Sequence, residues 1–97
     1  MRKIDILKNL RDQEMEWRIE PTARMTLKRR KYYSYYNTGI DLILNRIRDS
    51  KEAPETVVED FVSRMYRYLK LCPHNQDLYV ACIDAGDHIL DLLNMLH

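Results

Sequence analysis

The sequence predicts an all-α protein: a compact antiparallel bundle of three to four helices with one long central helix, folded as a single domain over residues 1–97. The chain holds only two glycines and three prolines, too few for the frequent turns that a set of short strands needs. Its apolar residues instead recur at three- and four-residue steps, the spacing of one helix face. With 45% hydrophobic and 32% charged residues, the chain is apolar enough to fold, and its length suits one domain.

The first two helices are expected at residues 3–19 and 22–49. Pro21 separates them, because proline lacks the amide proton that a helix interior requires and suits a first helical turn. The apolar side of the second helix comprises Met25, Tyr32, Tyr36, Ile40, Ile43 and Ile47. Gly39 lies at the edge of this side, and we expect the helix to continue through it. At 1.5 Å per residue the second helix would span about 40 Å and extend past its neighbours.

The third and fourth helices are expected at residues 54–72 and 76–96. Pro54 fits the first turn of the third helix, Pro73 ends that helix, and Asn75 is a candidate N-cap for the fourth. Acidic residues precede basic residues along the third helix, an order that complements the helix dipole. Because only a short connection joins these two helices, they should pack as antiparallel neighbours.

The near-neutral net charge conceals an uneven distribution. The chain has 16 Lys and Arg against 15 Asp and Glu. Residues 1–50 carry twelve basic and seven acidic side chains, whereas residues 51–97 carry four and eight. The two halves therefore have net charges of +5 and −4. These charges either neutralise each other within the bundle or form two faces that meet in a dimer.

A basic and tyrosine-rich segment at residues 24–36 is the most unusual feature of the sequence. A run of four cations leads directly into four tyrosines within five positions. Arg29 falls near the middle of the apolar side of the helix, where its guanidinium would need a carboxylate or a ligand. Cations neutralise phosphates and tyrosines stack on bases, so nucleic-acid binding is the alternative functional hypothesis. It assigns the contacts to Arg24, Lys28, Arg29, Arg30, Lys31 and Tyr33.

The leading hypothesis is a small cytoplasmic interaction or adaptor module without catalytic activity, which associates with itself or with another protein. Leu27, Tyr35 and Leu42 fall on the far side of the second helix from its apolar stripe. They mark a second apolar surface, which a partner would cover. The two hypotheses differ in one property, because nucleic-acid binding should weaken sharply with salt and a largely apolar protein interface should not.

Other chemistries have little support in the sequence. Cys72, His74, Cys82 and His88 match no standard zinc spacing, and His88 is expected on an exposed acidic face, so no metal or other cofactor is expected. Glycine-rich phosphate loops, nucleophile elbows and His-Glu-x-x-His motifs are missing, which argues against an enzyme with a small-molecule substrate. The absence of a secretory leader and of eighteen consecutive apolar residues predicts a cytoplasmic protein with reduced thiols and no membrane association.

Overall fold

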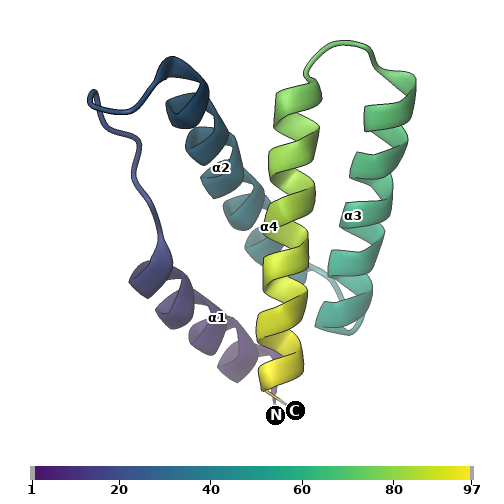
Figure 1. The fold of residues 1–97 in the computed structure, drawn as a ribbon. Coiled ribbons are helices and arrows are strands. Elements are labelled where there is room, and N and C mark those ends of the chain that lie inside the picture. The colour runs from purple at the N-terminus through teal and green to yellow at the C-terminus, as the bar shows by residue number, and fades with distance from the viewer. Residues whose placement is uncertain (1, 97) are drawn as a thin grey trace.

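The computed structural model describes residues 2–96 and folds them into four α-helices. The helices are α1 (Lys3–Trp17), α2 (Leu27–Asp49), α3 (Pro54–Leu71) and α4 (Gln76–Met95). Successive helices run in opposite directions along the bundle (Figure 1). No strand is present in the described residues. The prediction of an all-α antiparallel bundle is therefore confirmed.

The longest helix, α2, and the last helix, α4, form the central pair of the bundle. α2 has 23 residues and runs in the same direction as α4, whereas α1 and α3 run the opposite way (Figure 1). α4 packs most extensively against α2 and α3, and α1 contacts both central helices less extensively. The central pair therefore brings the basic half of the chain beside its acidic half.

The core is built from the helix faces that the apolar spacing predicts. On α1, Leu10 is fully buried, whereas Ile4 and Met15 are exposed on the other side. Large aliphatic and aromatic side chains with 2% exposure or less come from all four helices: Leu10, Ile40, Ile43, Leu44, Ile47, Val58, Phe61, Ile89 and Leu93. Burying each of these large side chains contributes about 2 kcal/mol relative to leaving it in water.

The connection between α1 and α2 is longer than the sequence predicts. The second helix begins at Leu27, so placing residues 22–26, Met25 among them, in a helix was wrong. Thr26 has extended backbone angles, with φ −60° and ψ 155°, and its hydroxyl accepts a hydrogen bond from the Arg29 backbone N–H at 3.2 Å. This N-cap satisfies a donor that has no partner within the helix, and it sets the start of α2. Elsewhere the predicted helix bounds agree with the observed ones to within two residues.

Two glycines allow the helices to approach α4 closely. α2 continues through Gly39, as predicted, and a Cβ at that position would lie 3.2 Å from both the Ala85 Cβ and the Cys82 Cα. A Cβ at Gly86 would overlap the Val62 side chain of α3. Close packing on both sides of α4 therefore offsets the roughly 1 kcal/mol by which each glycine disfavours its own helix.

Candidate functional site

The basic segment lies where the α1–α2 connection enters α2. Its cations are Arg24 in the connection and Lys28, Arg29, Arg30 and Lys31 in the first turns of the helix. All except Arg30 are exposed. Within residues 2–96, none of the five forms an ion pair with a carboxylate. Cations in the first turn of a helix also oppose its dipole, so the charge of this segment is uncompensated.

Two of these cations lie over tyrosine rings. The guanidinium carbon of Arg29 is 5.7 Å from the centre of the Tyr33 ring, and Lys31 Nζ is 5.8 Å from the centre of the Tyr35 ring. Such contacts hold a cation in place without neutralising it. Arg30 is half-buried, and its Nε has no hydrogen-bond partner among the described residues. Arg29 and Lys31 are therefore positioned by tyrosine rings of their own helix, and neither pairs with a carboxylate in residues 2–96.

The tyrosines that follow the basic run pack against α4. The Tyr32 hydroxyl donates a hydrogen bond to the Asp84 carboxylate at 2.6 Å, and the Tyr36 hydroxyl lies 2.6 Å from Nδ1 of His88. Burial and the bond to Asp84 raise the pKa of Tyr32 well above its ordinary range. Burial, followed by the nearby Asp84 charge, raises the pKa of Tyr36 to about 12. Both phenols are therefore neutral at neutral pH. Because Tyr32 and Tyr36 contact α4, the expectation that this end of the helix extends past its neighbours was wrong.

His88 is part of this contact between α2 and α4. It is half-buried beside Tyr36, with the two ring centres 6.4 Å apart, so its predicted place on an exposed acidic face was wrong. Burial lowers the pKa of His88, against the opposing effect of Asp91. A neutral imidazole with its proton on Nε2 accepts the Tyr36 hydroxyl at Nδ1.

An aromatic pocket lies beside the basic segment. It has a volume of about 260 Å³ and is lined by Ile19, Tyr32, Tyr33, Tyr36 and His88. The rings of Tyr32 and Tyr33 meet edge to face, with centres 5.3 Å apart and planes inclined at 77°. The ring centres of Tyr32 and Tyr36 are 6.1 Å apart. Two of the aromatic walls are therefore nearly perpendicular, an arrangement that suits a flat ring lying on one wall with its edge towards the other.

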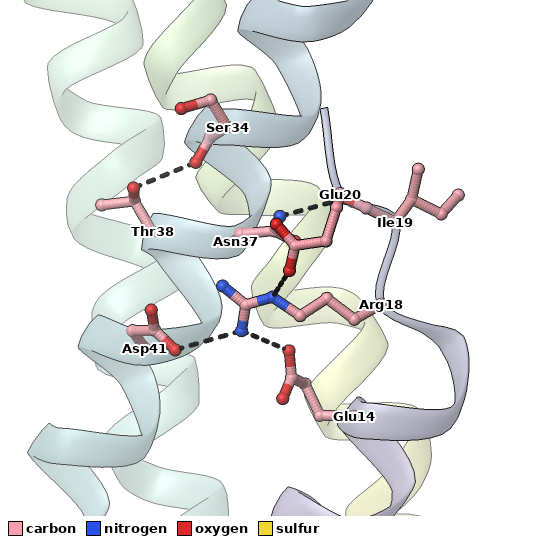
Figure 2. Close-up of polar contacts among 8 residues, drawn as sticks. All are labelled: Glu14, Arg18, Ile19, Glu20, Ser34, Asn37, Thr38 and Asp41. Carbon is pink, nitrogen blue, oxygen red and sulfur yellow. Dashed lines mark hydrogen bonds and ion pairs between the residues drawn. The ribbon is translucent and has the colours of Figure 1, made fainter. Parts of the chain in front are cut away.

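A polar cluster fastens the α1–α2 connection to α2 (Figure 2). Arg18 contacts Glu14 at 2.6 Å and Glu20 at 2.7 Å, and it reaches across to Asp41 on α2 at 3.6 Å. The Glu14 side chain is 8% exposed and that of Arg18 is 28% exposed. Although burial opposes it, bonding to Glu14 and the nearby Asp41 charge raise the pKa of Arg18. Arg18 therefore compensates the charge of Glu14, a buried carboxylate of α1.

A hydrogen bond from α2 holds the part of the α1–α2 connection that lines the aromatic pocket. The side-chain amide of Asn37 donates a hydrogen bond to the Ile19 carbonyl at 3.1 Å (Figure 2). Asn37 is buried on α2, four residues before Asp41. The contacts that Asp41 and Asn37 make with the connection therefore place Ile19 against the tyrosines of α2.

The predicted partner-binding residues lie in different surroundings on α2. Leu27 is 73% exposed in the first turn of the helix. Tyr35 is half-buried in a groove that Lys31 and the α3–α4 connection also line. Leu42 is 44% exposed and lines another groove, between α2 and α3. Tyr35 and Leu42 therefore belong to two separate grooves.

The α2–α3 groove has a volume of about 400 Å³. Its apolar lining comes from Leu42, Val57 and Phe61. The Arg46 guanidinium lies over the Phe61 ring, 5.7 Å from its centre. Charged residues of both signs surround the apolar lining: Arg46, Asp49, Glu52, Asp60 and Arg64. The groove therefore exposes the Leu42 side chain above the buried Val57 and Phe61, within a rim of mixed charge.

The cysteines lie apart from these features. Cys82 is 2% exposed, and burial raises the pKa of its thiol. Cys72 is half-buried at the end of α3. In residues 2–96, no three His, Cys, Asp or Glu side chains are placed to hold a metal ion. None of the helices in this range has the length and apolar character needed to cross a bilayer.

Neither the pairing of Asp84 and His88 with the tyrosines nor the polar cluster around Arg18 was expected from the sequence. A signal for the first pairing was present. Tyr32 and Tyr36 are four residues apart on one helix, as Asp84 and His88 are on another, so two helices in matching register would bring both pairs together. No comparable spacing signals the Arg18 cluster.

Comparison of the chain with protein-family models, with curated proteins and with solved structures found no match. The function of the chain is therefore inferred from the chemistry of its surfaces.

Proposed function

We propose that the protein is a small cytoplasmic interaction module without catalytic activity, which associates with a second copy of itself through the α2–α3 groove. The observation that carries this proposal is the mixed charge of the groove rim. In a twofold dimer the same patch meets itself, so a patch must be complementary to its own copy. A rim with both arginines and carboxylates around an apolar strip has that property.

Individual side chains on the rim support this arrangement. Arg64 on α3 is exposed, as are Asp60 and Glu52. Among the described residues, none of these three has an ion-pair partner within its own chain. In an antiparallel pairing of two grooves, Arg64 of each copy faces the carboxylates of the other. The Leu42 side chain of each copy becomes buried in the interface. An adaptor or regulatory subunit with this dimer would present two identical surfaces to other partners.

Replacing Leu42 with glutamate is expected to weaken self-association at least tenfold, which corresponds to about 1.4 kcal/mol. The substitution places an unpaired carboxylate in the apolar strip, where association would remove it from water. Sedimentation equilibrium of the wild-type chain and of L42E measures the effect directly. Circular dichroism is expected to show unchanged helix content, because Leu42 is 44% exposed in the single chain.

Leu27→Glu is the matched control for this experiment. It makes the same chemical change on the same helix, at a leucine outside the groove, so its dimer dissociation constant should stay within about twofold of the wild-type value. Equal weakening by both substitutions would contradict the assignment of the groove. A wild-type chain that sediments as a monomer at every accessible concentration would rule out self-association.

The second candidate function is nucleic-acid binding by the basic segment. A specific observation favours it: five basic residues stand together in the α1–α2 connection and the first turns of α2, without an ion-pair partner in residues 2–96. Their positive charge adds to the positive end of the helix dipole. A bound polyanion would offset both the repulsion among these cations and their repulsion by the helix dipole, since each phosphate supplies a compensating negative charge. The basic segment and the α2–α3 groove lie towards opposite ends of α2, so both surfaces can act in one molecule.

If this second function holds, affinity for single-stranded nucleic acid should fall steeply with salt. Contacts to four or five phosphates predict a slope of about −3 for the logarithm of the association constant against the logarithm of salt concentration. Between about 50 and 200 mM salt, affinity should therefore fall roughly 60-fold. Fluorescence anisotropy with a labelled strand measures this slope. No binding at the lowest salt concentration would leave the cations as a solvated helix end.

A further inference from the structure

We propose that the aromatic pocket beside the basic segment receives one unpaired base of a single-stranded nucleic acid, whose phosphates lie along the cations of α2. This proposal rests on the nucleic-acid function and names the form of its ligand. It joins two features, the uncompensated charge at the start of α2 and the pocket one turn further along the same helix.

The pocket has the chemistry of a base-stacking site. Its lining includes three tyrosines and one histidine, with Ile19 as an aliphatic wall. A flat base gains stacking energy on a tyrosine face whatever its identity, because every base has a π-face. The volume of about 260 Å³ is below the range typical of pockets for drug-sized ligands, and it suits a single ring system. A base within a duplex is stacked and paired, so only an unpaired or displaced base can enter such a recess.

Arg29 links the pocket to the phosphate-binding surface. Its guanidinium lies 5.7 Å from the centre of the Tyr33 ring, and Tyr33 lines the pocket. A base on the tyrosines therefore has a cation beside it, in the direction of the helix start. The same contact disfavours a cationic ligand, because Arg29 already lies over one aromatic wall and its neighbours are also positive.

The placement of the cations favours a strand over a free nucleotide. Successive residues of a helix point about 100° apart around its axis. Four consecutive cations at positions 28–31 therefore project to all sides of α2 and cannot converge on the phosphates of one nucleotide. A strand that passes the helix start can meet several of them while one of its bases occupies the pocket.

The test compares wild-type chain with variants of Tyr33, using a labelled single strand of about 12 nucleotides and an abasic strand of equal length. Wild-type chain is expected to bind the base-containing strand at least fivefold more tightly than the abasic one. Tyr33→Leu removes the ring but keeps an apolar side chain, and it should weaken binding of the base-containing strand about 5- to 100-fold. Binding of the abasic strand should not change. Tyr33→Phe keeps the ring and should retain wild-type affinity.

Tyr35→Leu is the matched control, because Tyr35 is the next tyrosine along the chain and lies in a different groove, also beside a cation. Because this variant loses only the ring beside Lys31 and keeps the pocket, it should retain the wild-type preference for the base-containing strand over the abasic one. If Tyr33→Leu binds the base-containing strand as tightly as the wild type does, the assignment of the pocket is wrong. The nucleic-acid function still holds in that case, provided that the abasic strand is also bound. If neither strand binds at low salt, both fail. If an unlabelled mononucleotide competes as effectively as the strand, the ligand is a free nucleotide and the assignment to a strand is wrong.

Discussion

Reversing the charge of four basic residues at the start of α2 is expected to weaken binding of single-stranded nucleic acid by at least 100-fold at about 50 mM salt. The variant replaces Lys28, Arg29, Arg30 and Lys31 with glutamate. Each substitution removes one phosphate contact and adds a repulsive charge, so the salt dependence that counterion release produces should disappear as well. Fluorescence anisotropy over a range of salt concentrations measures both effects.

Loss of binding in this variant will not reflect loss of folding. Glutamates in the first turns of a helix interact favourably with its dipole, whereas the native cations oppose it. Arg29→Glu also places a carboxylate three residues after Thr26, whose hydroxyl already caps the Arg29 N–H at 3.2 Å, and this spacing forms a capping box. The unfolding temperature should therefore be no lower than that of the wild type, and circular dichroism checks this.

A second variant with the same change in net charge separates a local site from a general charge effect. It reverses four exposed cations elsewhere on the bundle: Lys8, Arg11, Arg67 and Lys70. Both variants start from a formal charge of +1 and become equally acidic, so long-range repulsion is matched. Binding should survive in this control at about 50 mM salt. Equal loss in both variants would show that net charge, and not the start of α2, governs the interaction.

Replacing Arg18 with methionine is expected to destabilise the fold by about 2 kcal/mol and to lower its unfolding temperature by roughly 10 °C. Arg18 compensates Glu14, whose side chain is only 8% exposed, at 2.6 Å (Figure 2). Methionine keeps much of the packing volume but leaves a buried carboxylate without its partner. The expected loss is below that for a fully buried pair, because the Arg18 side chain is 28% exposed. Thermal and urea unfolding measure it.

Two further variants test whether the effect arises from Glu14. Glu14→Leu combined with Arg18→Met removes both charges and should recover most of the lost stability, as the removal of whole buried pairs does elsewhere. Arg48→Met removes an arginine whose ion pair with Asp49 is exposed on both sides, and it should leave the unfolding temperature nearly unchanged. If Arg18→Met behaves like Arg48→Met, solvent already compensates Glu14 and the cluster does not stabilise the fold.

Most of the fold could be predicted because the apolar spacing of these helices is regular. Val57, Val58 and Phe61 follow a single helix face and are buried together, since burial of that face supplies most of the stability of an amphipathic helix. Pro54 takes the first turn of α3, where its missing N–H is harmless. The start of α2 was misplaced because the helix does not begin directly after Pro21 but at Leu27, where Thr26 provides the cap.

The candidate site was only partly predictable, because spacing along a helix says which residues share a side and not what faces them. The sequence by itself singles out the run of cations and the tyrosines after it. It does not say that Tyr32 reaches Asp84, which is 52 positions away.

That contact depends on the rotation and register of α2 against α4, which the core and the close approach at Gly39 establish together. The same holds for Arg18, whose carboxylate partners come from α1, the connection and α2. Helix formation follows from local periodicity, and so the amino-acid order decides it. The aromatic pocket and the uncompensated charge beside it depend on contacts between distant segments, and only the packing of the four helices decides those.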